Sequence, residues 1–282
     1  MQAYCLYSKQ FSLEFRRGVI DKVTAQAGKL SYTVKKWEEN AMRSFLAALC
    51  FSLLSLCTYA TPAKPVVIHL VTASWQGFSN PDETGYYFDI LRKAFPAPDW
   101  QLDVQFMPFA RTLYMVETSR VDMILSVYKG DVKNSLLSEN PVELDSIDAA
   151  VTPQIAATWS GMESLSHKKV QAMLAYRYNM LTTIPMFYEE GSDILSMLNS
   201  VNAGRTDAVL DYRKNMETLV PQLKAPQQFV IIPGVLTAET YFAFANTEKG
   251  RMLKQHFDIE HKKLIDSGEQ ERLYTETKAN GY

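Results

Sequence analysis

Polar side chains follow two apolar segments that are expected to be buried strands. Ser126 and Tyr128 follow the run "VDMIL", and Asp211 and Tyr212 follow the run "TDAVL". In open parallel sheets, ligands bind just beyond the carboxyl ends of the strands. These four hydroxyl, phenol and carboxylate groups are therefore candidates for a polar ligand site.

The same local pattern precedes both runs. Apolar residues recur at helical spacing of three and four, as Phe109, Leu113 and Val116 in one copy and Ile194, Leu198 and Val201 in the other. After each stripe come a small residue, an arginine, any residue, an aspartate and the apolar run. The pattern predicts one helix-to-strand unit used twice, with Gly204 as a left-handed helix cap in the second copy.

The rest of the chain alternates between strand and helix patterns, which is typical of an α/β fold with mostly parallel sheets. Strands are expected at residues 66–71, 102–106, 121–127, 169–175, 206–210 and 229–235, and helices at 84–95, 109–117 and 192–203. A long C-terminal amphipathic helix is expected to break at Ser267-Gly268. Residues 139–154 look less regular than the rest.

The composition is that of an ordinary globular protein. Of 282 residues, 47% are hydrophobic and 21% are charged. Residues 61–282 lack 8 of the 29 basic and 4 of the 31 acidic residues, which leaves a net charge of −6 with histidine neutral. This balance disfavours polyanions, so we expect no nucleic-acid partner.

Residues 42–60 resemble a secretory signal peptide. They contain one arginine near the start, an apolar run from Phe45 to Cys57, and Thr58-Tyr59-Ala60 as the peptidase site. Cleavage after Ala60 would export a chain without cysteine, so we expect a periplasmic protein stabilised by its core rather than by disulfides. The apolar run is short for a membrane span, which needs about 20 residues.

Two alternatives for this N-terminal region stay open. Residues 1–41 are an over-extended start or an unstructured extension, and a genuine extension would turn the apolar run into an uncleaved anchor. Lipid attachment at Cys57 is the second alternative, although Leu56 is a poor match to the small residue that such processing prefers.

Five fragments resemble family 3 extracellular solute-binding proteins of amino-acid-type ABC transporters. They are "TGYYFDIL", "SRVDMIL", "SENP", "GRTDAVL" and "LIDSGEQERLY", in the family's order from about Val66 to Tyr274. The resemblance implies a type II periplasmic-binding-protein fold of two lobes joined by two chain crossings. We expect residues 66–153 and 237–282 to form lobe 1 and residues 154–236 to form lobe 2.

The resemblance also implies a ligand closed between the lobes, and this chain departs from the family in that region. Where amino-acid binders carry an arginine for the ligand carboxylate, this chain has "YKGDVKN". Lys133 supplies a charge there without the planar fork of arginine. The position matching the family's ammonium-binding aspartate falls on Tyr212, one residue after Asp211.

Other residues are expected to complete the ligand site. Arg111 or Arg177 is the candidate for an anionic group, although a surface position or an interlobe ion pair is an equal alternative for Arg111. Asp211 is expected to face a cation, unless it merely caps neighbouring backbone. Trp75 and Phe78, in the loop after the first strand, are expected to form an aromatic wall.

We therefore expect a monomeric binding protein that delivers a small, carboxylate-bearing solute to an inner-membrane ABC permease, without a cofactor or metal. None of the common catalytic motifs, such as a P-loop or a Gly-x-Ser-x-Gly elbow, occurs in the chain. The alternatives are a dehydratase-like enzyme on the same fold and a ligand-binding module of a sensor.

Overall fold

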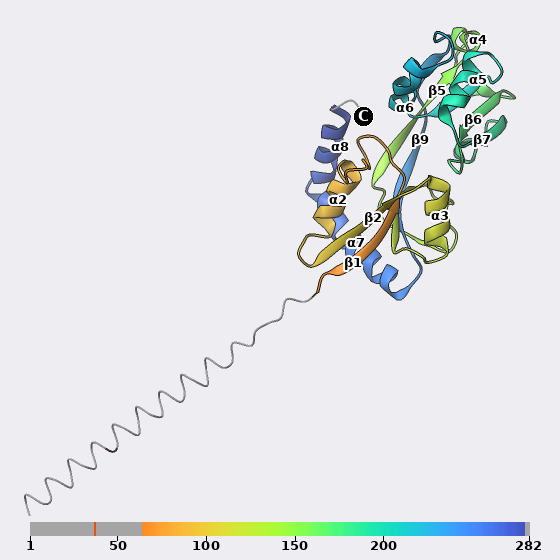
Figure 1. Cartoon of the computed structure of the whole chain (residues 1–282). Coiled ribbons are helices and arrows are strands. Elements are labelled where there is room, and N and C mark those ends of the chain that lie inside the picture. Colours follow the sequence, from red (N-terminus) through yellow and green to blue (C-terminus); the bar gives the residue numbers. More distant parts are fainter. Residues whose placement is uncertain (1–36, 38–63, 280–282) are drawn as a thin grey trace, which may run out of the picture. The chain divides into compact units, whose positions relative to one another are not determined.

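The computed structural model describes residue 37 and residues 64–279 (Figure 1). The predicted signal peptide at residues 42–60 lies outside these residues, as do residues 1–36. In the described part, no helix has both the length and the apolar character needed to cross a membrane.

Strands and helices alternate through much of the described chain, as the sequence pattern predicts, except that three strands follow one another between residues 123 and 151. The strands are β1 (Val66–Thr72), β2 (Trp100–Phe106), β3 (Met123–Val127), β4 (Leu136–Leu137), β5 (Glu143–Val151), β6 (Lys169–Met173), β7 (Phe187–Gly191), β8 (Ala208–Asp211) and β9 (Val230–Phe244). The helices are α2 (Tyr86–Ala94), α3 (Phe109–Glu117), α4 (Pro153–Ala157), α5 (Ile194–Asn202), α6 (Arg213–Leu219), α7 (Glu248–Asp266) and α8 (Glu269–Ala279), with short 3-10 turns at Met162–Leu165, Tyr178–Leu181 and Val220–Gln222.

The strand order is β2-β1-β3-β9-β5-β8-β6-β7, with β4 paired to β9. At one end β1 runs parallel to β2 and β3, and at the other β6 runs parallel to β7 and β8. Between these parallel groups, β9 and β5 pair antiparallel to their neighbours. The observed fold is therefore the predicted α/β architecture of two parallel groups flanked by helices.

Two long strands connect the parallel groups (Figure 1). β9 pairs with β5 from Val230 to Thr240 and with β3 from Tyr241 to Phe244. β5, with nine residues, bridges from β9 to β8. The expectation that residues 139–154 are irregular was wrong, because most of this segment is the strand β5.

The apolar stripes that the sequence indicated are buried. Phe109, Leu113 and Val116 of α3 pack in a core cluster with β1, α2, β3 and α7. Leu198 and Val201 of α5 pack in a separate cluster with the end of β8. The chain from Lys64 onward is one compact unit, and its division into two lobes at the expected boundaries stays a prediction.

A glycine holds the loop after β1 against the start of α2. Gly85 has φ +109°, and a Cβ there would lie 2.8 Å from the carbonyl oxygens of Gly77 and Phe78. Those same carbonyls accept hydrogen bonds of 3.0 Å from the backbone N–H groups of Tyr86 and Tyr87. The close approach fixes the loop that carries the two predicted aromatic residues, Trp75 and Phe78.

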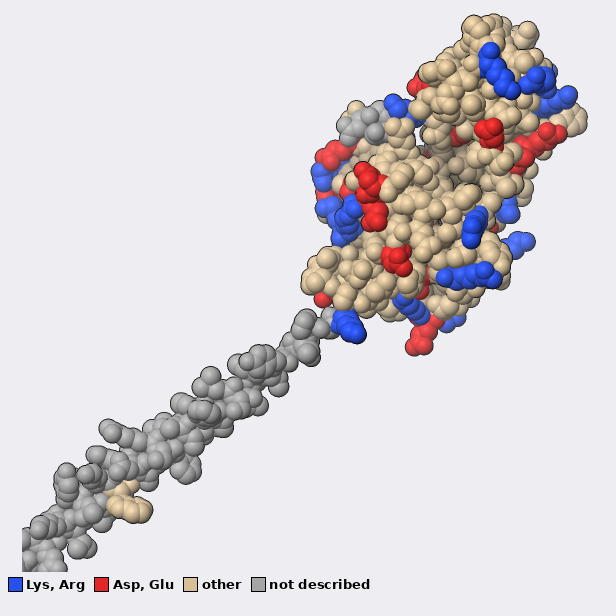
Figure 2. All heavy atoms as spheres, viewed as in Figure 1, with Lys and Arg blue, Asp and Glu red and all other residues tan. Residues whose placement is uncertain are grey.

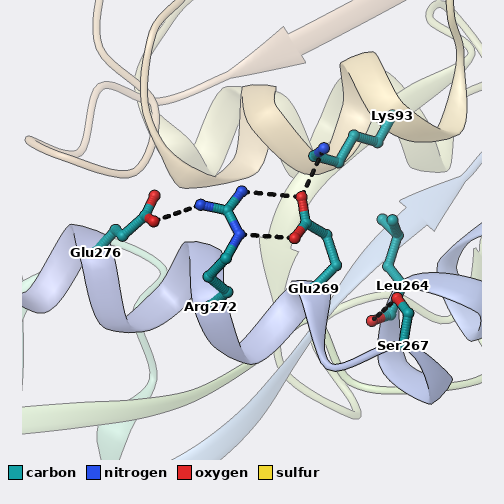
Figure 3. Close-up of polar contacts among 6 residues, drawn as sticks. All are labelled: Lys93, Leu264, Ser267, Glu269, Arg272 and Glu276. Atoms are coloured by element: carbon teal, nitrogen blue, oxygen red, sulfur yellow. Dashed lines mark hydrogen bonds and ion pairs between the residues drawn. The ribbon is translucent and has the colours of Figure 1, made fainter.

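An ion-pair network joins the C-terminal helix α8 to α2 (Figure 3). Lys93 of α2 lies 2.6 Å from Glu269, and Arg272 grips the same carboxylate through two bonds of 2.7 and 2.9 Å while also pairing with Glu276. Exposed pairs of this kind contribute about 0–1 kcal/mol each, so they orient α8 more than they stabilise it. The predicted break between α7 and α8 is confirmed at Ser267-Gly268, where Gly268 has φ +74°.

Candidate functional site

A cavity of about 340 Å³ lies where the loop after β1 meets the middle of β5, the start of α6 and the end of α8. Its lining combines aromatic rings, carboxylates and basic side chains. The residues that line it are Trp75, Gln76, Phe78, Tyr87, Ser126, Glu143, Asp145, Ser146, Asp148, Tyr212, Arg213, Lys214, Asn215, Glu217 and Lys278.

Two of the lining carboxylates, Glu143 and Asp145, are the first and third residues of the strand β5. Residues two apart on a strand point to the same face and are separated by about 6.6 Å along the chain. Glu143 is 6% exposed and Asp145 is 3% exposed. The strand thus presents two nearly buried acidic groups side by side to the cavity.

Tyrosine hydroxyls hold both carboxylates. Tyr87 of α2 donates to Oε2 of Glu143 and also lies 3.0 Å from Oγ of Ser126. Tyr128 and Tyr212 both donate to Oδ2 of Asp145, the latter at 2.9 Å. These are neutral donors, so they satisfy hydrogen-bonding capacity without neutralising the charge.

Burial disfavours the charged form of both acids. The pKa of Glu143 is raised to about 8, first by desolvation and then by repulsion from Asp145, while Tyr87 and Lys278 act in the opposite direction. Desolvation also raises the pKa of Asp145, against the hydrogen bonds from Tyr128 and Tyr212. The unliganded cavity therefore favours a protonated Glu143 near neutral pH.

Aromatic rings form one side of the cavity and link two loops. The indole Nε1 of Trp75 donates a 3.0 Å hydrogen bond to the hydroxyl of Tyr176, which lies in the loop after β6. Phe109 packs edge-on against both rings, with centroid distances of 5.6 Å to Trp75 and 5.7 Å to Tyr176. This cluster connects the loop after β1 with the opposite parallel group of strands.

Of the eight residues expected to bind ligand, three line the cavity. Trp75 and Phe78 stand on the loop after β1, as expected, and Tyr212 follows β8. Tyr128 lies directly behind the wall, where its hydroxyl contacts Asp145. The structure thus brings together the polar groups that follow β3 and β8.

Asp211 is buried and is not among the residues that line the cavity. It is 1% exposed, and its Oδ1 accepts hydrogen bonds from the backbone N–H of Tyr212 at 2.7 Å and from the Asn215 side chain at 3.2 Å. Burial raises its pKa to about 7. These contacts match the capping role that the sequence left open for this residue.

The three expected cationic residues lie away from the cavity lining. Arg111 is exposed in the first turn of α3, and Arg177 is exposed after β6 with φ +50°. Lys133 is exposed in the loop after β3, where its backbone N–H donates to the carboxylate of Glu117. The basic side chains that do line the cavity are Arg213, Lys214 and Lys278.

The acidic pair on β5 was missed by the sequence interpretation. Its signal is the spacing in "VELDSI", where Glu143 and Asp145 alternate with other residues between the apolar Val142 and Ile147. Such alternation fits a half-buried strand. Charged side chains are almost never fully buried unless they are paired, so their burial could not be read from their type.

The cavity has the groups needed to bind a small polar ligand and to exchange a proton with it. A carboxyl group whose pKa lies near neutrality is able to accept or donate a proton at physiological pH. Among the described residues, no group of three or more His, Cys, Asp or Glu side chains has a geometry for holding a metal ion.

No protein-family model matches the chain, and no curated protein matches it by sequence. Solved structures do resemble it in fold. One is the probable amino-acid ABC transporter extracellular-binding protein from Bacillus subtilis, with 20% identity, a TM-score of 0.57, and coverage of 78% of this chain and 100% of the other. At these identities the likeness establishes the fold, which is that of transporter-associated binding proteins.

Two further structures carry different ligand and activity descriptions. An amino acid ABC transporter substrate-binding protein from Streptococcus pneumoniae, bound to L-arginine, has 16% identity and a TM-score of 0.56, with coverage of 75% of this chain and 94% of the other. An ancestral amino-acid-binding protein, described as a precursor of cyclohexadienyl dehydratase, has 15% identity and a TM-score of 0.57, with coverage of 74% and 94%. The fold therefore occurs in binding proteins and in the ancestry of an enzyme.

Proposed function

We propose that the protein is a solute-binding protein that captures a small polar, amino-acid-like solute in the cavity and delivers it to an ABC permease. The observation that carries this proposal is the cavity of about 340 Å³, which is lined from both sides of the β5–β9 connection. Binding pockets of this kind combine apolar and aromatic walls with a few convergent polar groups.

In this proposal the ligand binds between the two lobes expected from the sequence and contacts both of them. Trp75 and Tyr87 come from the expected lobe 1, and Tyr212 and Arg213 from the expected lobe 2. A ligand that contacts both sets selects the closed arrangement, because only that arrangement satisfies all the contacts at once. The permease would then recognise the closed form.

The same proposal includes export of the protein to the periplasm, where it would act in soluble form. Acidic and basic side chains are interspersed on the face shown in Figure 2 rather than gathered by sign. Such a surface offers no extended patch to a polyanion. We propose that the protein acts as a monomer.

Mass spectrometry of solutes released from the purified protein tests the proposal. We expect one small polar molecule in near-stoichiometric amount, and we expect the stripped protein to rebind it with a dissociation constant in the micromolar range, which corresponds to about −8 kcal/mol. The absence of any released solute, together with no stabilisation by a broad panel of small polar metabolites, would contradict it.

A second candidate is an enzyme that acts on a small carboxylate. The observation that favours it is the raised pKa of Glu143, about 8, which suits a general acid inside a cavity. In that case the stripped protein would convert the bound solute, and Glu143→Gln would abolish turnover. A solute recovered chemically unchanged after prolonged incubation favours binding alone.

A further inference from the structure

The charges on the cavity wall identify the class of ligand. We infer that the ligand carries an amine or guanidinium cation and that Glu143 and Asp145 together form its counter-charge. This inference rests on the proposed solute-binding function and makes that function more specific. It differs from the expectation that Asp211 alone faces the cation.

The first argument is the cost of the two carboxylates without a ligand. Both side chains are more than nine-tenths buried, and each is held by tyrosine hydroxyls, which are neutral. A buried charge costs several kcal/mol unless an opposite charge compensates it. Lys278 is the cation whose field reaches both acids, yet their pKa values remain raised. A ligand cation would supply the missing compensation.

The second argument is an oxygen of Glu143 that can accept a further hydrogen bond. Tyr87 donates to Oε2 of Glu143, and within the described residues no hydrogen bond reaches Oε1. Glu143 lines the cavity, so Oε1 can accept a hydrogen bond from a ligand once the carboxyl group is ionised. Ammonium and guanidinium groups provide several such donors.

The third argument is the aromatic lining. Trp75, Phe78, Tyr87 and Tyr212 contribute rings to the wall, and cations within about 6 Å of such a ring are attracted to its face. Lys278 already uses this interaction, with its ammonium 5.2 Å from the Phe78 centroid and 5.3 Å from that of Tyr274. The wall can therefore bind a cation both through the carboxylates and through cation–π contacts with the aromatic rings.

Two of the three basic residues of the lining belong to a different part of the wall from Glu143 and Asp145. Arg213 and Lys214 open α6, and Arg213 lies 3.9 Å from Glu217. The residues that β5 contributes to the lining are the acids Glu143, Asp145 and Asp148 and the neutral Ser146. The ligand's cation is therefore placed beside β5.

Calorimetric titration of the full-length exported protein tests the inference with three defined probes. Agmatine and putrescine carry two cations and no carboxylate, whereas glutarate carries two carboxylates and no cation. We expect at least one of the two amines to bind and glutarate not to bind. Glu143→Gln and Asp145→Asn should each weaken the amine by tenfold or more, and Glu163→Gln, at an exposed site on the 3-10 turn Met162–Leu165, should not.

Thermal melts of the unliganded variants separate binding from folding. Asp145→Asn removes a carboxylate whose charged form is disfavoured by burial, and Glu143→Gln replaces a carboxyl group that is protonated near neutral pH with a neutral amide of similar shape. We therefore expect melting temperatures equal to or above that of the wild type. Binding of glutarate, or of a neutral solute found by mass spectrometry, without either amine would overturn the cation assignment and leave the solute-binding function standing. Binding of no probe, with no solute released, would overturn both.

Discussion

The chemistry of this protein is concentrated in a few buried side chains whose types alone suggest a solvated surface. Glu143 and Asp145 are acidic residues in a stretch that lacks strong apolar character, yet both are nearly inaccessible to solvent. Three tyrosines from three different elements supply their hydrogen bonds. Tertiary structure therefore decides the role of these residues.

The raised pKa of Glu143 makes the stability of the unliganded protein depend on pH. Its ordinary value is 4.5 and its folded value is about 8, so the folded state binds more protons between these limits. Stability is then highest below about pH 4.5 for this group and falls as the pH rises to 8, by an amount on the order of a few kcal/mol. The groups that interact with Glu143 include Tyr86, Tyr87, Asp145, Tyr274 and Lys278.

Glu143→Gln removes this contribution. We expect the stability difference between the variant and the wild type to grow in favour of the variant from pH 5 to pH 8.5, as measured by urea unfolding without ligand. Buried acids that do not interact with Glu143, such as Asp211, titrate equally in both proteins and cancel in the difference. A difference that stays constant over this range would show that Glu143 is not protonated in the folded state.

Asp211 offers a contrast with Asp145. Its Oδ1 accepts hydrogen bonds from the backbone N–H of Tyr212 and from the side chain of Asn215, so Asp211→Ala, which removes this acceptor, should lower the melting temperature and change ligand affinity less than Asp145→Asn does. The loss of one partner in a buried hydrogen-bonded group costs about 1–3 kcal/mol. Paired melts and titrations check this. A large affinity loss with an unchanged melting temperature would instead place Asp211 in contact with the ligand's cation.

At the scale of elements, the repeated helix-to-strand unit was the most informative sequence pattern. It located the ends of β3 and β8, and thereby Ser126 and Tyr212, which both line the cavity. The strand β5 was not predicted, because acidic residues occupy positions that are expected to be apolar in a buried strand. The groups that contact these two acids are Tyr87 of α2, Tyr128 after β3 and Tyr212 after β8, which are distant from β5 in the chain.

The close contact at Gly85 predicts a strong effect of a single methyl group. In Gly85→Ala the new Cβ would lie 2.8 Å from two carbonyl oxygens at a backbone conformation that only glycine adopts readily. We expect a loss of stability of at least about 1–3 kcal/mol and weaker ligand binding, since the loop with Trp75 and Phe78 must move. Chemical unfolding and titration measure both effects.

Gly130→Ala is the matched control for this prediction. Gly130 also has a positive φ of +101°, but a Cβ there would meet nothing within 4 Å. It shares the backbone strain without the collision. Equal losses in the two variants would mean that strain alone, rather than the contact with the loop, accounts for the effect at Gly85.

The hydrogen bond from Trp75 to Tyr176 joins the loops after β1 and β6. Tyr176→Phe removes the acceptor and leaves the indole N–H unpaired, which costs about 0.5–1.5 kcal/mol. If closure around the ligand forms this contact and the open form lacks it, affinity should fall roughly two- to tenfold, because 1.4 kcal/mol corresponds to a factor of ten. Tyr114→Phe, at an exposed ring on α3, is the control and should bind normally.

At the scale of the whole molecule, the fold could be predicted from the sequence more fully than the site. Most of the strands and helices, the repeated unit and the split C-terminal helix follow from local periodicity, whereas β5, β7 and α6 were not predicted. The position of the expected cations Arg111, Lys133 and Arg177 could not be inferred, because it depends on which side of the helix α3 and of each loop faces the cavity. The resemblance motifs gave the order of elements and not these orientations.

Processing of the N-terminus is a prediction about the whole chain. We expect the exported protein to begin at Thr61, because Thr58 and Ala60 offer the small side chains that signal peptidase recognises. N-terminal sequencing of secreted material measures it. A mature chain that retains Met42, or one that carries lipid at Cys57, would support the anchored or lipidated alternative instead.

The most direct test of the account is calorimetric titration of the ligand-stripped wild type and of Asp145→Asn with the solute that mass spectrometry identifies. Solute binding in the cavity predicts one-to-one binding with a micromolar dissociation constant in the wild type. It also predicts at least a tenfold weaker constant, or about 1.4 kcal/mol, in the variant. Equal affinity of the two proteins, in the presence of normal folding of both, would contradict the placement of the ligand beside β5.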